Sequence, residues 1–169
     1  MANTASPYSI ITVTPTLTAG EAYADGDVLF EPTEIPNAVL GNGGCCKLIK
    51  AFLIDYDRDT FTADIIFTEK STPAIGTKHA TAGITDADFR TTGFIGALKF
   101  DNQSTVDDID NVKPAELQSL SGAGESVDPM LLQAADDSTS VYVSAVLASG
   151  SPTFTNTNDI QLVLHIQKK

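Results

Sequence analysis

The chain has 169 residues, 42% of them hydrophobic and 19% charged, and this composition is typical of one globular domain rather than of a disordered chain. Ten Lys and Arg residues against 22 Asp and Glu residues give a formal charge of −12. Such an acidic chain lacks the basic surface that binds DNA, RNA or an anionic membrane, so we expect no nucleic acid and no membrane among its partners.

Alternation of apolar and polar residues predicts several short strands in the first half of the chain. The predicted strands here are 8–18, 28–30, 45–55 and 61–68. In the first of them Ile11 and Val13 alternate with threonines, which predicts an N-terminal strand or arm over residues 1–18. The two apolar-rich strands 45–55 and 61–68 are separated by the turn 57–59, and we expect them to form a hairpin.

The second half of the chain is predicted to hold one short helix and further strands. Thr85 followed by two acidic residues favours an N-capped helix near 85–91. Strands are predicted at 94–100, 115–120, 141–147 and 160–166, and 130–135 is a further apolar segment. The polar stretch 101–128 is expected to be a long surface excursion. In the last strand one face carries Ile160, Leu162, Leu164 and Ile166.

These elements predict an all-β fold. Eight to ten short strands at turn spacings, interrupted by one helix near 85–91, are typical of an antiparallel β-sandwich, and we expect a jelly-roll-like one. No internal repeat is present. We expect residues 1–169 to form a single β-sandwich domain.

The two cysteines, Cys45 and Cys46, are adjacent in a predicted strand. Neighbours on a strand point to opposite faces, so we expect one buried and one surface cysteine rather than a disulfide. A vicinal redox pair is the alternative. The start of the chain lacks the basic and apolar regions of a secretory signal.

Acidic turns are the first candidate sites. Residues 55–59 read Asp-Tyr-Asp-Arg-Asp, which resembles the start of a calcium loop, but Thr60 and Ile66 stand where that loop needs Gly and Glu. A solvated hairpin turn is one interpretation, and a Ca²⁺ site on Asp55, Asp57 and Asp59 is the other. Paired carboxylates also serve glycosidases, but the chain has no Trp and four Tyr to line a sugar cleft.

The two histidines offer no catalytic or metal-binding set by their spacing. His79 lies in a predicted loop and His165 on the outer face of the last strand, with no second ligand near either in the sequence. No serine stands in a nucleophile elbow. We expect His165 to be a sheet-surface or subunit-interface residue, no cofactor, and no enzymatic activity.

Three stretches carry a resemblance to a known group of proteins. They are residues 22–29, the segments 51–55 and 64–67, and the ending formed by 141–155 and 159–164. This combination resembles small virion structural proteins of tailed bacteriophages, capsid decoration or cement proteins among them, over residues 8–167. The resemblance implies a particle component located in the virion and assembled in the host cytoplasm, and it carries over no catalytic residue.

The resemblance and the acidic charge together favour a decoration protein on the outer capsid surface. Its expected partners are the major capsid protein and further copies of itself, a homotrimer in preference to a dimer. Candidate interface residues are Ile11, Val13, Tyr23, Phe154 and His165. The first alternative is a tail, baseplate or fibre-tip module that binds a host receptor through loop residues such as Tyr23 and Phe154. The remote alternative is a carbohydrate-active enzyme.

Overall fold

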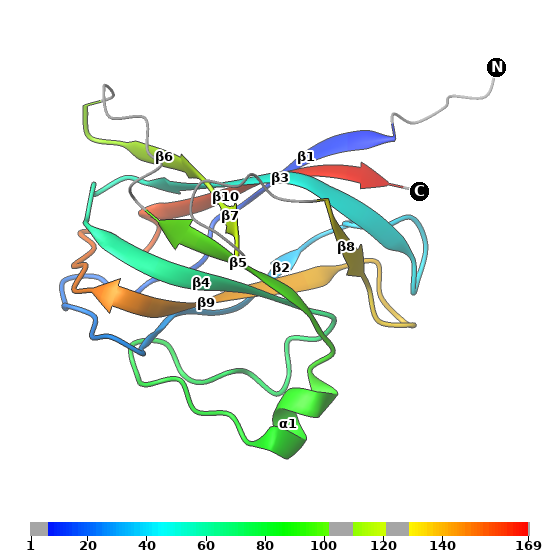
Figure 1. Cartoon of the computed structure of the whole chain (residues 1–169), viewed down its shortest axis with the longest axis horizontal. Helices are drawn as coiled ribbons and strands as arrows, with labels where there is room; N and C mark the ends of the chain where they lie inside the picture. The colour runs from blue at the N-terminus through cyan, green and yellow to red at the C-terminus, as the bar shows by residue number, and fades with distance from the viewer. Residues whose placement is uncertain (1–6, 102–109, 121–128, 169) are drawn as a thin grey trace.

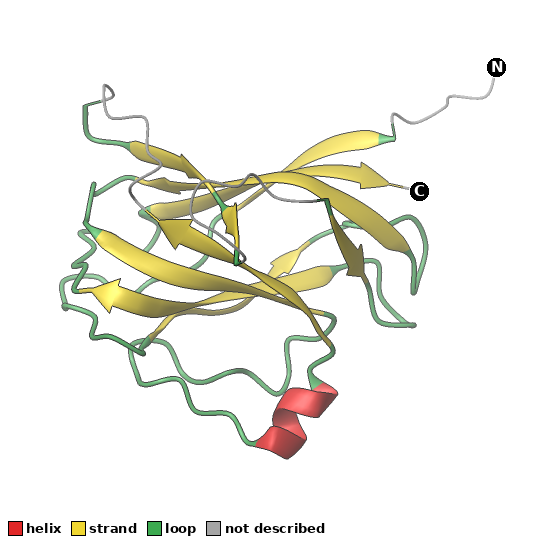
Figure 2. Ribbon diagram, in the orientation of Figure 1, coloured by secondary structure: helices red, strands yellow, loops and turns green. Residues whose placement is uncertain are grey.

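Two antiparallel β-sheets face each other across one hydrophobic core in the computed structural model of the chain (Figures 1 and 2). The structure describes residues 7–101, 110–120 and 129–168. Strands dominate this part of the chain and there is one short helix, so the predicted all-β sandwich is confirmed. No helix among the described residues is long and apolar enough to cross a membrane.

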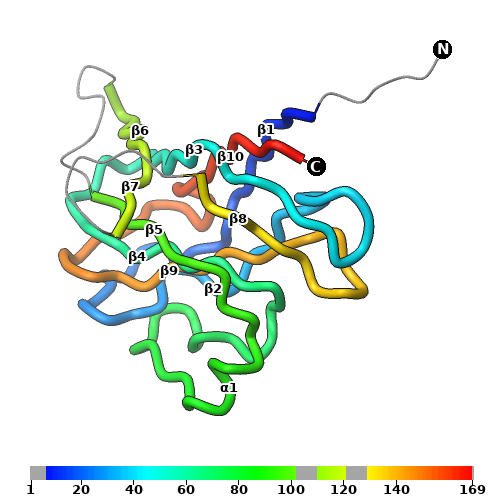
Figure 3. The backbone as a smooth tube through the Cα atoms, turned by 45° about the vertical axis from the view of Figure 1, so that its right-hand side comes forward, coloured from blue at the N-terminus to red at the C-terminus, as the bar shows by residue number. Residues whose placement is uncertain are grey.

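The first sheet, called sheet I below, contains the two ends of the described chain. Its strand order is β1-β10-β3-β6, and β8 pairs with the remaining part of the same edge of β3. Its strands are β1 (Tyr8–Val13), β3 (Cys45–Asp55), β6 (Lys113–Glu116), β8 (Met130–Gln133) and β10 (Ile160–Lys168). Figure 3 shows β1 and β10 side by side.

The second sheet, called sheet II, packs against the first. Its strand order is β2-β9-β4-β5-β7. Its strands are β2 (Val28–Ile35), β4 (Phe61–Thr68), β5 (Phe94–Asp101), β7 (Gln118–Ser119) and β9 (Val141–Gly150). The helix α1 (Asp86–Thr91) lies in the connection between β4 and β5, and Figure 1 shows it on the side of sheet II that is away from sheet I.

The order in which the strands pair is that of a jelly roll. The pairs are nested: β1 with β10, β2 with β9, β3 with β8, and β4 with β5. The chain therefore winds as one long folded hairpin whose successive pairs alternate between the two sheets, which is the double Greek key of this fold. The strands β6 and β7 are additions to it.

The core forms where the inward faces of the two sheets meet. Every second residue of β10 is buried, and these are the four residues predicted from the alternation, Ile160, Leu162, Leu164 and Ile166. The opposite sheet contributes aromatic side chains, and the rings of Phe61 and Phe100 lie 4.8 Å apart. Side chains of alternating direction thus fill one interior from both sides, as in other sandwiches.

The predicted hairpin of 45–55 with 61–68 is wrong, although both strands exist with those bounds. β3 pairs with β10, β6 and β8 in sheet I, and β4 pairs with β5 and β9 in sheet II. The turn between them crosses from one layer to the other, with Arg58 in a left-handed conformation at φ 59°. Because the chain crosses between the sheets at this turn, β3 and β4 bury their apolar faces from opposite sides of the shared core although they do not pair with each other.

The strand predicted at 28–30 continues to Ile35 despite Pro32. β2 lies at the edge of sheet II, where a proline without an N–H costs no ladder hydrogen bond. Its register with β9 shifts on both sides of Phe30, so Pro32 falls at an irregular point of the ladder.

The predicted helix is present, and the predicted segments 1–18 and 101–128 both contain strands within their described residues. The Thr85 hydroxyl accepts a hydrogen bond from the Asp88 amide, which confirms the predicted N-cap. In the predicted strand or arm 1–18, the described residues form the strand Tyr8–Val13 and an irregular segment after it, in which Leu17 is buried. Within the predicted excursion 101–128 the described residues form β6 and β7 and bury Leu117. Residues 1–6, 102–109 and 121–128 lie outside the described part.

Candidate functional site

Two of the predicted interface residues, Tyr23 and Phe154, are core residues. Tyr23 is 1% exposed and Phe154 is fully buried. Their rings meet edge to face at 5.8 Å, and Phe154 also packs against Phe61 at 6.0 Å. The loops that carry them fold over one end of the sandwich, so neither side chain is available to a partner. The prediction that they form a binding surface is therefore wrong.

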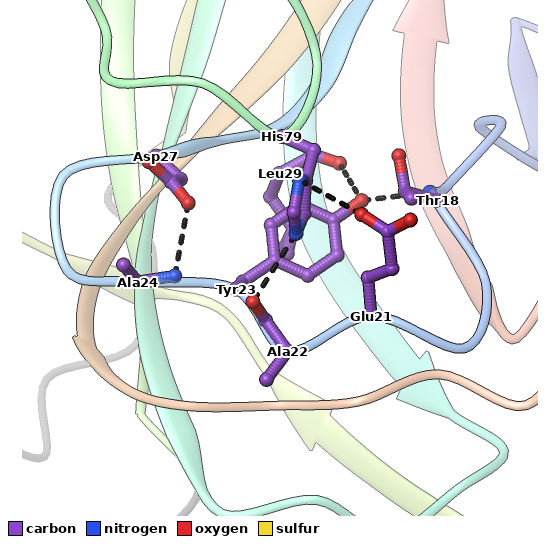
Figure 4. Close-up of polar contacts among 8 residues, drawn as sticks. All are labelled: Thr18, Glu21, Ala22, Tyr23, Ala24, Asp27, Leu29 and His79. Atoms are coloured by element: carbon purple, nitrogen blue, oxygen red, sulfur yellow. Dashed lines mark hydrogen bonds and ion pairs between the residues drawn. The ribbon is translucent and has the colours of Figure 1, made fainter.

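The hydroxyl of Tyr23 makes two hydrogen bonds to backbone groups, one in the turn between β1 and β2 and one in β2 (Figure 4). The hydroxyl accepts from the Thr18 amide at 2.8 Å and donates to the Leu29 carbonyl at 3.1 Å. Burial raises the pKa of this phenol above its ordinary value. A buried hydroxyl with both roles satisfied is a structural anchor for the turn between β1 and β2.

His79 joins the same anchor from the connection between β4 and β5 (Figure 4). Its ring lies 4.8 Å from the Tyr23 ring in a T-shaped contact. Its Nε2 is 3.1 Å from the Ala22 carbonyl oxygen, and its Nδ1 is 3.6 Å from a carboxylate oxygen of Glu21. The imidazole therefore ties two loops together, and each nitrogen already faces an oxygen of this chain.

The acidic turn 55–59 also has a structural role. A carboxylate oxygen of Asp59 accepts a hydrogen bond from the Thr153 amide at 2.9 Å, and one of Asp57 accepts from the Thr155 amide. These bonds tie the β3–β4 crossing to the β9–β10 connection. Each of the two carboxylates therefore uses one oxygen to hold the backbone of the neighbouring loop.

Asp55, the third residue of the predicted Ca²⁺ site, is fully buried at the end of β3. Its Oδ1 accepts from the Asp57 amide at 2.9 Å, and its Oδ2 has no hydrogen-bond partner in the described structure. Burial raises the pKa of this carboxyl from 3.8 to about 6. Within residues 7–101, 110–120 and 129–168, no group of three or more His, Cys, Asp or Glu residues is placed to hold a metal ion.

The outer face of sheet I is the strongest candidate for a binding surface. Large apolar side chains point outward from its strands, and Ile10, Tyr8 and Leu131 are 64%, 62% and 55% exposed. Cross-strand pairing places Val163 of β10 directly beside Phe52 of β3. Polar residues lie among them, since Gln167 and Lys47 stand between Tyr8 and Leu131 in the pairing of these strands. Exposed apolar residues that gather on one face with polar residues around them mark interaction sites.

His165 lies on this face, as predicted. It alternates with the buried Leu164 and Ile166, and its ring is 5.5 Å from that of Phe52. It borders a surface hollow of about 380 Å³ whose other lining residues include Tyr8, Ile10 and Ile49. The hollow lies where β1 meets β10, at one margin of the apolar face.

The remaining predicted interface residues, Ile11 and Val13, point the other way. Val13 is 4% exposed within the core, and Ile11 is half-buried and packs against it. The outward side chains of β1 are instead Tyr8, Ile10 and Thr12. Ile10 and Ile11 are adjacent in one strand, so one of the two isoleucines must face outward. This adjacency is the feature of the sequence that could have predicted an exposed apolar residue on β1.

Charge is distributed unevenly over the molecule. The strands β1, β3 and β10 together carry Lys47, Lys50, Lys168 and one acidic residue, Asp55, which is buried. At the margin of this face, the Lys50 ammonium pairs with Glu116 of β6 at 3.2 Å. On a chain of net charge −12, these strands thus form a surface without exposed carboxylates. The charge that these strands expose is positive, and a face of this sign complements a partner surface that carries carboxylates.

The fold does not select a function by itself. Jelly rolls serve as capsid domains, lectins and cupins. Comparisons of the chain with models of protein families, with curated proteins and with solved structures find no match. The geometry that bears on function is therefore the outer face of sheet I and the strand edge that borders it.

Proposed function

We propose that the chain is a non-enzymatic structural protein of a virion: a capsid decoration (cement) protein that binds the outer surface of a tailed-phage head. The observation that supports this most is the exposed apolar face of sheet I on an otherwise acidic molecule. Its partner in this proposal is the major capsid protein. The protein is assembled onto the particle in the host cytoplasm.

The binding chemistry follows from the composition of this face. Burial of Ile10, Phe52, Val163 and Leu131 against an apolar lattice surface supplies the free energy of attachment, at about 25 cal/mol for each Å² of apolar area removed from water. Lys47 and Lys50 favour a lattice surface that carries carboxylates. A protein that binds only the assembled lattice stabilises that lattice by mass action.

The number of copies in purified virions tests the proposal against the tail alternative. Quantitative mass spectrometry against the major capsid protein is expected to give a simple fraction of the number of capsid subunits. A handful of copies would instead indicate a tail or baseplate location. Absence from the particle would contradict both structural hypotheses.

A matched pair of valine variants tests the face itself. Val163 and Val146 are both half-buried, and both point outward from a strand with neighbours on each side, β10 in sheet I and β9 in sheet II. Val163→Lys is expected to lower the occupancy of the protein on particles about tenfold or more, since an unpaired charge is costly in an interface. Val146→Lys should leave occupancy unchanged. Equal occupancy of the two variants, both folded by circular dichroism, would exclude sheet I as the attachment surface.

A further inference from the structure

The strand β1 lies at the edge of sheet I. It is the last strand of sheet I and pairs with β10 on one side, and no other described strand pairs with it. The Pro7 carbonyl accepts a hydrogen bond from the Lys168 amide, so Pro7 and Lys168 are one of the opposed pairs that are hydrogen-bonded. Because hydrogen-bonded residues alternate in an antiparallel pair, Tyr8, Ile10 and Thr12 direct their backbone N–H and C=O groups away from β10.

The other sheet edges carry features that block strand addition, and β1 does not. β2 contains Glu31 and Pro32 and has two register shifts. β6 contains Lys113 and Pro114, and β7 and β8 have only two and four residues. Charges, prolines, bulges and shortness are the usual protections of an edge strand. β1 has six residues with no charge and no proline.

We propose that β1 pairs antiparallel with β1 of a second copy of this chain across a twofold axis, which joins the two copies of sheet I into one continuous sheet. The register that places the axis at Ile10 sets Ile10 opposite Ile10 of the partner. This opposed pair exchanges two backbone hydrogen bonds. The twofold axis is perpendicular to the sheet, so both outer faces lie on the same side.

Charge favours a second copy as the occupant of this edge. A twofold interface brings the same surface patch of both copies together, so an acidic patch on a chain with net charge −12 would repel its copy. The first charged residue of the chain is Glu21, which leaves the whole of β1 uncharged. Pairing of like edges closes after two copies, so this edge favours a dimer rather than a trimer.

The hollow beside the edge adds an apolar contact to the backbone pairing. Ile10, 64% exposed, lines the hollow together with Ile49 and His165. In the proposed register the two Ile10 side chains lie next to each other on the outer face. The dimer would therefore present one apolar face of doubled width, formed from both copies. This inference concerns the chain alone and does not depend on attachment to a capsid.

Sedimentation of the purified full chain over a concentration series tests the dimer. The native chain is expected to dimerise, and Ile10→Lys is expected to abolish the dimer because two like charges then face each other across the axis. Leu131→Lys is the matched control: this residue is 55% exposed on the same face but lies on β8. It should dimerise as the native chain does. A monomer at every concentration, or a dimer that persists with Ile10→Lys, would overturn the proposal.

Cross-linking tests the register independently. In a Cys45→Ser background, where Cys46 is buried, Ile10→Cys places two thiols opposite each other. Hydrogen-bonded antiparallel partners have Cα atoms about 5.5 Å apart, within the range for a disulfide. Mild oxidation is expected to give a covalent dimer with Ile10→Cys and none with Leu131→Cys. Equal yields from the two variants would contradict β1 pairing, whatever the result of virion counting.

Discussion

Replacing Asp55 by asparagine is expected to stabilise the protein near neutral pH and to lose that advantage in acid. The side chain is fully buried, and one of its oxygens has no hydrogen-bond partner among the described residues. Burial raises its pKa from 3.8 to about 6. Because one pKa unit corresponds to about 1.36 kcal/mol, ionising this carboxyl at neutral pH costs the folded state about 3 kcal/mol.

The sign of the pH dependence follows from proton binding. Between pH 3.8 and about 6 the folded state binds more protons at Asp55 than the unfolded state does, so the free energy of unfolding falls as pH rises through this window. Below the window both states are protonated and the difference disappears. Asparagine keeps an acceptor for the Asp57 amide and never ionises.

Denaturant unfolding of the native chain and of Asp55→Asn over a pH series measures this effect. The free energy of unfolding of the variant, minus that of the native chain, should rise by about 3 kcal/mol from about pH 3.5 to about pH 7. Asn42→Ser, at an exposed turn position, changes no ionisable group and is the control, so it should give a difference that does not vary with pH. A flat or falling difference for Asp55→Asn would refute the argument from burial.

Three further predictions concern single residues. Tyr23→Phe should lower the free energy of unfolding by about 1–3 kcal/mol in denaturant melts, because the half-buried Thr18 amide and the buried Leu29 carbonyl lose this partner. An unchanged unfolding midpoint would contradict the role of Tyr23 as an anchor. In the folded protein an alkylating reagent should modify the half-exposed Cys45 while Cys46 stays unmodified, because Cys46 is buried and burial raises the pKa of its thiol to about 11. Peptide mass spectrometry measures the extent of modification at each cysteine. Faster modification of Cys46 than of Cys45 would contradict this prediction. Gly150→Ala should destabilise the protein more than Gly20→Ala does. Both glycines have positive φ, but a Cβ at Gly150 would lie 2.6 Å from a backbone oxygen, whereas one at Gly20 would meet nothing within 4 Å. Equal decreases in melting temperature for the two variants would contradict the close approach at Gly150.

The strands and the helix of this protein could be predicted from local patterns. Alternation places Leu162 and Leu164 on one face whichever strands lie beside them, and Thr85 followed by acidic residues signals a helix start. The split of Cys45 and Cys46 between surface and core followed from the same rule. Each of these features depends on residues a few positions apart, so the sequence carries them directly.

The candidate site could be predicted only in part. His165 was expected on an outer face and lies there, but Ile10, the most exposed apolar residue of that face, was not singled out. Tyr23 and Phe154 stand among Gly, Thr and Asp residues, which predicts exposed loops. Their burial depends on two loops closing over the same end of the sandwich, and these loops are more than one hundred residues apart.

The amino-acid sequence by itself determined which residues form strands, which face of each strand is apolar, and the absence of charge from β1. Only the tertiary structure decided that β3 and β4 lie in different sheets, that β1 lies at the edge of sheet I, and which apolar side chains remain outside. The reason is physical. Side-chain direction follows from the backbone of one strand, whereas backbone hydrogen-bonding groups are the same in every strand, so the choice of partner depends on how the whole core packs.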